Sequence, residues 1–124
     1  MAYKLKTNRG ILFTITKEDF DPAAYMEQLN NNRILMVSLG GIMMQKSNIL
    51  WVADEKALEE KGKHVIEMTS GDKINVNIKD FNADALTIDF NNHENTFALV
   101  GGAIVNRRGV DMILPADVAG GDPV

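Results

Sequence analysis

The chain has 124 residues, of which 45% are apolar, with a net charge of −4 and no cysteine. This composition suits a compact globular protein and argues against wholesale disorder. The lack of cysteine excludes disulfides, thiol chemistry and thiolate zinc sites. The mildly acidic balance gives no general attraction to nucleic acid or anionic lipid.

The most apolar stretch, residues 34–44, is interrupted by a serine and two glycines. It is much shorter than the roughly 20 apolar residues that a membrane-spanning helix needs, so we expect no membrane segment. The first residues contain no apolar run typical of a signal peptide. We therefore expect a cytoplasmic protein.

The two halves of the sequence resemble each other. A shift of 61 positions places residues 5–52 on 66–113 without a gap, and eight aligned pairs are identical. These pairs are Gly10 and Gly71, Asp19 and Asp80, Phe20 and Phe81, Ala24 and Ala85, Asn30 and Asn91, Asn31 and Asn92, Gly40 and Gly101, and Gly41 and Gly102. Two αβ segments can align modestly by chance, but keeping dipeptides of turn type together with a Gly-Gly step favours a tandem duplication.

The first unit, residues 1–52, begins with a predicted hairpin of strands 3–7 and 11–17, whose turn ends at Gly10. A helix is expected next, because Asp21 is a natural N-cap and Pro22 suits the first helical position. Phe20, just before the cap, is placed to pack on the first turns. Strands 34–39, 42–45 and 49–52 then predict a β-meander with a turn at 46–48, so the unit reads ββαβββ.

Residues 53–63 are rich in helix formers and predict a linker helix that begins at Asp54 and ends at Gly62. The second unit, residues 64–118, repeats the pattern with strands 65–69, 73–78, 96–100, 103–106 and 110–114. Residues 82–90 alternate like a strand, but the symmetry favours a helix capped by Asn82. Residues 119–124 are expected to form a flexible tail. The predicted fold is α+β, mainly antiparallel β, with two pseudo-symmetric units in one compact domain.

No convincing catalytic set is present, so we predict that the protein is not an enzyme and holds neither cofactor nor metal. His64 and His93 lack companions at ligand spacing and are expected to be exposed polar residues; metal ligation is the alternative. Asp19 and Asp80 are expected to begin turns or to cap helices. They leave open a small enzyme with an acid–base pair between the units.

The most interesting repeated feature is basic. Lys46 aligns with Arg107, and each is expected at the tip of a hairpin. If the tips converge, Lys46, Arg107 and Arg108, with Gln45 and Asn106 beside them, form a binding site for phosphates or for a partner's carboxylates. Simple solvated tips are the alternative.

Nucleic-acid binding through these tips is the second functional reading. It is weakened by the scarcity of aromatic residues, because single-strand binders stack bases on exposed rings. Among the aromatic residues, only Tyr3 and Trp51 are candidates for exposed rings.

Met36, Met43 and Met44 form a soft apolar group with Trp51. Core packing is the preferred interpretation, and an adaptable partner surface is the alternative. Because the chain lacks a reactive constellation and is dominated by strands, we expect a non-catalytic protein-binding or assembly protein. Open sheet edges favour pairing with a partner or with another copy, so self-association into a homo-oligomer is also expected.

Overall fold

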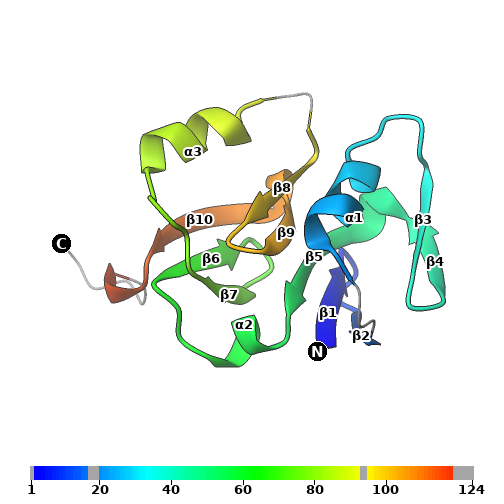
Figure 1. Ribbon diagram of the computed structural model, residues 1–124, viewed down its shortest axis with the longest axis horizontal. Helices are drawn as coiled ribbons and strands as arrows, with labels where there is room; N and C mark the ends of the chain where they lie inside the picture. Colours follow the sequence, from blue (N-terminus) through cyan, green and yellow to red (C-terminus); the bar gives the residue numbers. More distant parts are fainter. Residues whose placement is uncertain (1, 17–19, 93–94, 119–124) are drawn as a thin grey trace.

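The computed structural model describes residues 2–16, 20–92 and 95–118. Its strands are β1 (Ala2–Thr7), β2 (Leu12–Thr16), β3 (Met36–Leu39), β4 (Ile42–Gln45), β5 (Ile49–Asp54), β6 (His64–Met68), β7 (Lys73–Val76), β8 (Phe97–Val100), β9 (Ala103–Asn106) and β10 (Val110–Pro115). Its helices are α1 (Pro22–Leu29), α2 (Lys56–Glu59) and α3 (Ala83–Phe90), with 3₁₀ turns η1 (Lys46–Asn48), η2 (Arg107–Gly109) and η3 (Ala116–Val118). The predicted α+β class with mainly antiparallel strands is confirmed (Figure 1).

The strands form three antiparallel sheets. The five-stranded sheet has the order β2-β1-β5-β9-β8, the three-stranded sheet has the order β10-β6-β7, and β3 pairs with β4 alone. In the first sheet Trp51 lies opposite Val105 and Val52 opposite Ile104. The β8–β9 hairpin, which is distant in sequence, thereby extends the sheet that β1, β2 and β5 begin.

The elements of the two halves follow in the same order. The bounds of α1, β3, β4, η1 and β5, each raised by 61, are the bounds of α3, β8, β9, η2 and β10. The register irregularity also recurs, since β5 skips Leu50 in its pairing with β1 and β10 skips Asp111 in its pairing with β6. The β3–β4 and β8–β9 hairpins turn on glycine pairs with positive φ, Gly40-Gly41 and Gly101-Gly102, a conformation that L side chains rarely adopt.

Local signals explain both longer helices. The Asp21 carboxylate accepts hydrogen bonds from the N–H groups of Ala23 and Ala24 at 3.0 and 3.4 Å. The ring of Phe20 lies 5.6 Å from that of Tyr25, which is the expected packing across the helix start. At α3, the Asn82 side chain accepts from the N–H of Ala85 at 3.0 Å. The helix expected at 82–90 is therefore confirmed, and the strand alternative is wrong.

Three expectations need correction or lie beyond the described residues. Residues 46–48 and 107–109 are 3₁₀ turns between strands that do not pair with each other, so they are not hairpin tips and each meander ends after its second strand. Only residues 56–59 of the expected linker helix are α-helical, with the Asp54 carboxylate accepting from the N–H of Lys56 at 3.0 Å. The tail at 119–124 falls outside the described residues.

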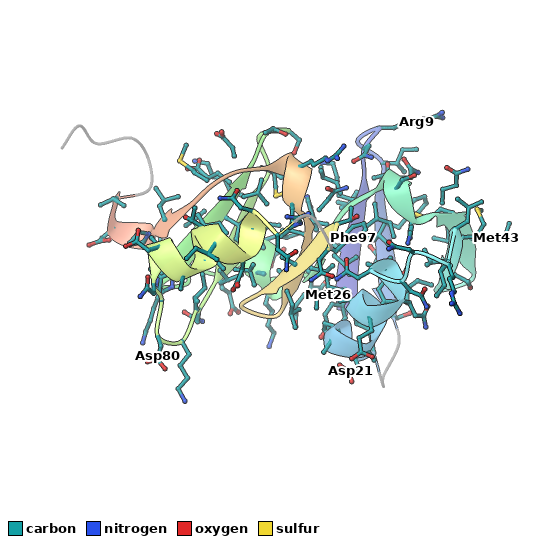
Figure 2. The ribbon with its side chains drawn as sticks, turned by 90° about the horizontal axis from the view of Figure 1, so that it is seen from above. Arg9, Asp21, Met26, Met43, Asp80 and Phe97 are labelled. Atoms are coloured by element: carbon teal, nitrogen blue, oxygen red, sulfur yellow. The ribbon has the colours of Figure 1, made fainter. Side chains whose placement is uncertain are left out.

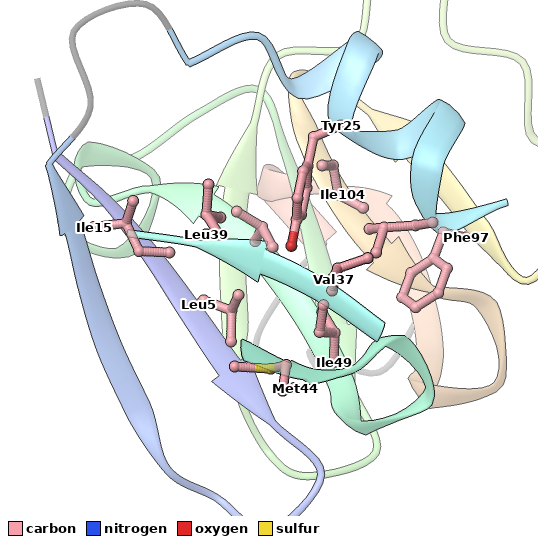
Figure 3. Close-up of a cluster of buried hydrophobic side chains, with 11 residues drawn as sticks. Leu5, Ile15, Tyr25, Val37, Leu39, Met44, Ile49, Phe97 and Ile104 are labelled. Carbon is pink, nitrogen blue, oxygen red and sulfur yellow. The ribbon is translucent and has the colours of Figure 1, made fainter. Parts of the chain in front are cut away.

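Each half completes the apolar core of the other. The first core holds Phe97 and Ile104 of the second half among side chains of α1 and of strands β1 to β5, as Figure 3 shows. The second core holds Leu50, Trp51 and Ala53 from β5 of the first half. Strand β5 thus has buried side chains on both faces and neighbouring strands on both edges.

Candidate functional site

The basic residues singled out in the sequence partly converge on a groove. It has a volume of about 1050 Å³, and its wall contains Asn8 and Ser47 from the first half with Thr96, Asn106, Arg107 and Arg108 from the second. None of the described residues that line it carries a carboxylate. In a protein of net charge −4 this groove is locally positive.

The polar side chains of the groove differ in how far they are already hydrogen-bonded within the protein. The Arg107 guanidinium donates to the carbonyl of Phe90, and its Nε is buried with no acceptor among the described residues. The Asn106 amide has a structural role, since it accepts from the N–H of Arg108 at 3.1 Å and donates to the carbonyl of Ile49 at 3.3 Å. Arg108 is exposed, and no described carboxylate forms an ion pair with it.

Two of the predicted binding residues stay outside the groove. The Lys46 ammonium donates to the carbonyl of Asn31 at 2.5 Å, and Gln45 is an exposed residue at the end of β4. From the sequence Lys46 is expected in the groove, but the next residue, Ser47, lines it instead. The basic side chains that line the groove, Arg107 and Arg108, therefore both come from the second half.

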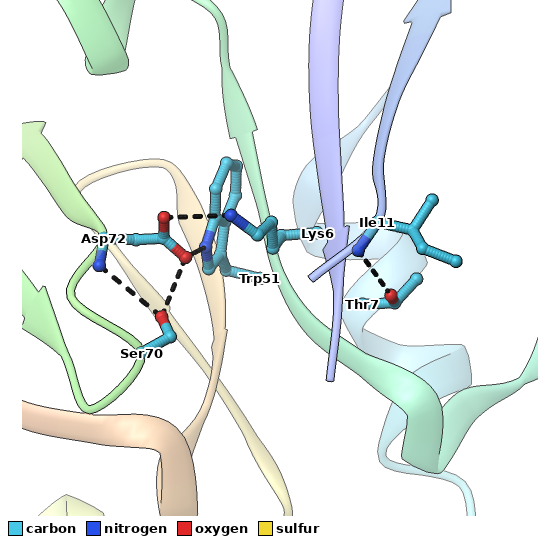
Figure 4. A network of polar contacts seen from close by, with 6 residues as sticks. All are labelled: Lys6, Thr7, Ile11, Trp51, Ser70 and Asp72. Carbon is cyan, nitrogen blue, oxygen red and sulfur yellow. Dashed lines mark hydrogen bonds and ion pairs between the residues drawn. The ribbon is translucent and has the colours of Figure 1, made fainter. Parts of the chain in front are cut away.

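A polar cluster that sequence reasoning missed joins the two halves around Asp72 (Figure 4). Its carboxylate accepts from the indole N–H of Trp51 at 3.1 Å, from the hydroxyl of Ser70 at 2.8 Å and from the ammonium of Lys6 at 3.1 Å. Burial by itself would raise the pKa of Asp72, but the hydrogen bonds and the Lys6 charge outweigh it and lower the pKa below its usual value. With both oxygens bonded, the group holds the halves together rather than offering a reactive carboxylate.

Several other expectations can be placed. Trp51 is buried, so the prediction of an exposed ring there is wrong. His64 is buried as well; its Nδ1 accepts from the N–H of Ile78 at 3.2 Å, and its ring lies 4.6 Å from that of Phe81. Asp80 is exposed in a turn with φ +54°, as a turn residue should be.

His93 lies outside the described residues, and so does Asp19, one member of the alternative acid–base pair. The part of the chain that the structure describes contains no group of three His, Cys, Asp or Glu side chains able to hold a metal ion.

A second, apolar surface lies between α3 and β10. A depression of about 210 Å³ there includes Leu86 and Phe90 from the helix with Val110 and Ile113 from the strand. We call these four residues the α3–β10 surface. Helix α1 buries Tyr25 and Leu29, whereas α3 has no buried residue, and β10 is the edge strand of its sheet.

The β3–β4 hairpin has one buried and one exposed face. Val37, Leu39 and Met44 point into the first core. On the other face Met36 is 39% exposed and Met43 is 72% exposed, and Figure 2 shows Met43 at the periphery of the molecule. We call Met36 and Met43 the methionine face. The sequence groups these residues with Met44 and Trp51, but the structure divides them between core and surface.

Within the described residues, no helix is long and apolar enough to span a membrane. Comparison with protein-family models, with curated proteins and with solved structures finds no match to this chain.

Proposed function

We propose that this chain is a non-catalytic protein-binding and assembly protein that takes its partner at the α3–β10 surface by strand addition. The observation that supports this is the combination of an open strand edge with an apolar depression beside α3, a helix in which Leu86 and Phe90 are only partly buried. An open edge offers main-chain hydrogen bonds, and the apolar depression beside it selects alternating side chains of an added strand.

The proposal includes the tandem duplication of a ββαβββ unit. It is supported by the recurrence of element bounds at a spacing of 61, by the shared glycine turns and by the shared bulge. A duplicated unit would carry two binding surfaces of one kind. The surface between α1 and β5 is filled within the chain by β8–β9, which leaves the α3–β10 surface for a partner.

A selection of short random peptides on the immobilised full-length protein tests the binding surface. Leu86→Lys places a charge within the surface, and Ile88→Lys is the matched control, because Ile88 lies on the same helix, is 72% exposed and does not line the depression. We expect extended peptides with alternating apolar residues to bind the wild type and Ile88→Lys equally. Leu86→Lys should weaken them at least about tenfold, the equivalent of one buried side chain. Equal binding by both variants would contradict the proposal.

The groove supports a second candidate function, the binding of nucleic acid. Arg108 is exposed without an ion-pair partner among the described residues, and no described carboxylate opposes a phosphate in the groove. The buried Arg107 Nε is a further donor in the same part of the molecule without an acceptor among the described residues.

Fluorescence anisotropy with labelled single- and double-stranded oligonucleotides tests this candidate. Two phosphate contacts predict a slope of about −2 for the logarithm of the binding constant against the logarithm of the salt concentration. Arg108→Ala should halve the slope and weaken binding, while Lys46→Ala, outside the groove, should leave both unchanged. Binding that ignores salt, or that depends on Lys46 and not on Arg108, would rule the candidate out.

A further inference from the structure

We infer that the occupant of the α3–β10 surface is the methionine-faced β3–β4 hairpin of a second copy of this chain, so that copies join head to tail. The inference rests on the proposed function and names its partner. It is drawn from an interface that the chain already contains, the one between α1, β5 and the β8–β9 hairpin.

The internal interface shows what such a contact requires. Strand β9 pairs with β5, and the hairpin places Phe97 (1% exposed) and Ile104 (0% exposed) in the core beneath α1. Figure 3 shows Ile104 beside Tyr25 of α1. The Asn30 side chain at the end of α1 fastens the hairpin, because it donates to the carbonyl of Phe97 at 3.0 Å and accepts from its N–H at 2.9 Å.

The inserting half of this interface exists a second time and is unoccupied. The shift that aligns the two halves carries Phe97 to Met36 and Ile104 to Met43, the two residues of the methionine face. They are apolar like their counterparts, yet they are exposed where Phe97 and Ile104 are buried. The β3–β4 hairpin is therefore built like the β8–β9 hairpin, but its methionine face is exposed.

The receiving half also exists a second time. In the first half its residues are at most 7% exposed: Tyr25, Leu29, Ile49 and Val52. The same shift carries them to the α3–β10 surface, whose residues are all only partly buried: Leu86, Phe90, Val110 and Ile113. Figure 1 shows β3–β4 at one end of the long axis and α3 with β10 on the other half of the molecule, so one chain cannot fill its own surface.

The internal register defines the register between copies. By the same shift, Met112 and Ile113 of β10 would lie opposite Met44 and Met43 of the second copy. Asn91, which aligns with Asn30, is exposed, and in this register its amide would face the main chain of Met36 of the second copy. The sheet β10-β6-β7 then gains β4 and β3 and acquires the order of the five-stranded sheet.

Where a residue of the internal interface is replaced by a different type in the interface between copies, its partner is replaced as well. Beside the internal interface, Trp51 of β5 donates to Asp72, which lies between β6 and β7 of the second half. At the corresponding place between copies Met112 meets Ile11, and these apolar residues are 45% and 49% exposed in the free chain. A polar pair is thus replaced by an apolar pair, which leaves neither partner unsatisfied.

A second pair changes in the opposite direction. Leu50 packs so tightly on Gly109 that a Cβ there would lie 2.5 Å from the Leu50 Cδ1. Between copies the same place brings Asp111 to Asn48, two polar residues that can hydrogen-bond. In a contact between copies, a residue replaced on one side must be matched by a replacement on the other side, as in these two pairs. Residues that face solvent have no partner to match.

Because the inserting and receiving surfaces are different, the contact is heterologous. Such contacts generate a closed ring when the rotation closes and an open filament when it does not. Either product follows from one interface used repeatedly.

Size-exclusion chromatography with in-line light scattering, and mass photometry, both on the full chain, test the inference. The wild type should assemble with rising concentration. Met43→Lys and Leu86→Lys should each weaken self-association at least about tenfold, so that each stays monomeric at concentrations where the wild type assembles. An equimolar mixture of these two variants should form a one-to-one pair that stops there, because one inserting and one receiving surface remain intact. Ile88→Lys should assemble like the wild type.

Introduced cysteines test the register, since the chain has none of its own. Met43→Cys with Ile113→Cys should give disulfide-linked multimers on oxidation. Met43→Cys with Met112→Cys should give no such multimers. Met112 and Ile113 are adjacent in β10, so their side chains point to opposite faces of the sheet.

A wild type that stays monomeric at millimolar concentration, or variants that fail to complement each other, would overturn the inference. Peptide selection that still depends on Leu86 would then preserve the binding surface with a different protein as its occupant. Loss of both results would overturn the proposed function as well.

Discussion

Asp72 forms a polar link between the two halves. Its carboxylate takes hydrogen bonds from Trp51 and Lys6 of the first half and from Ser70 of its own turn. The sequence predicts Trp51 and His64 at the surface, yet both are buried. Their burial arises from neighbours distant in sequence, which local patterns do not reveal: Trp51 lies on the central strand β5, and His64 packs against Phe81.

The lowered pKa of Asp72 makes a prediction about acid stability. The folded-state pKa lies below the ordinary value of 3.8, so the carboxylate stabilises the fold above that pH, and this stabilisation is lost as the pH falls through the folded pKa. Asp72→Asn should lower the free energy of unfolding at pH 7 by about 1–3 kcal/mol. Urea titrations between pH 7 and 3 should show the difference from the wild type shrinking towards the acid end.

Asp80→Asn is the control for this experiment, because Asp80 is an exposed turn residue and asparagine tolerates its positive φ. It should follow the wild type throughout. A difference between wild type and Asp72→Asn that is independent of pH would show that the ionised carboxylate is not what stabilises the junction.

At the scale of elements, α1 and α3 have the same length, similar caps and equivalent places in the chain, but they differ in what covers them. The β8–β9 hairpin lies beneath α1, and no described strand occupies that position beneath α3. The two helices and most strands could be predicted from the sequence, because caps, glycine turns and alternation are local signals. The pairing of β5 with β9 could not, because strands in separate halves meet through tertiary contacts that no local pattern encodes.

The difference between the helices predicts unequal responses to truncation. Leu29→Ala should lower the free energy of unfolding by about 2–5 kcal/mol, because the side chain is fully buried and leaves a cavity. Leu86→Ala should cost less than about 1 kcal/mol, because the side chain is already partly solvated. Both are measured by denaturant unfolding in a Met43→Lys background, so that assembly does not contribute. Equal costs would mean that α3 packs as firmly as α1.

At the scale of the whole molecule, the candidate surfaces are visible in the sequence only in part. Arg107 is recognised by its alignment with Lys46, Arg108 by its place beside it, and two of the methionines by their clustering. What the sequence does not reveal is which repeated residues are covered within the chain and which are left open, since the two halves look equivalent as patterns. The asymmetry comes from connectivity: the β8–β9 hairpin of the second half packs on the first half, and no described strand takes the equivalent place on the second half.

The position of Phe97 and Ile104 in the first core has a consequence for synthesis. While the first half leaves the ribosome, α1 and β5 lack the hairpin that will cover them, and β5 waits for a partner strand far downstream in the chain. The first half therefore emerges without two side chains of its core, and its apolar face stays open until β9 has emerged. A nascent chain that pauses between the halves would present the same kind of surface that the finished protein retains at α3 and β10.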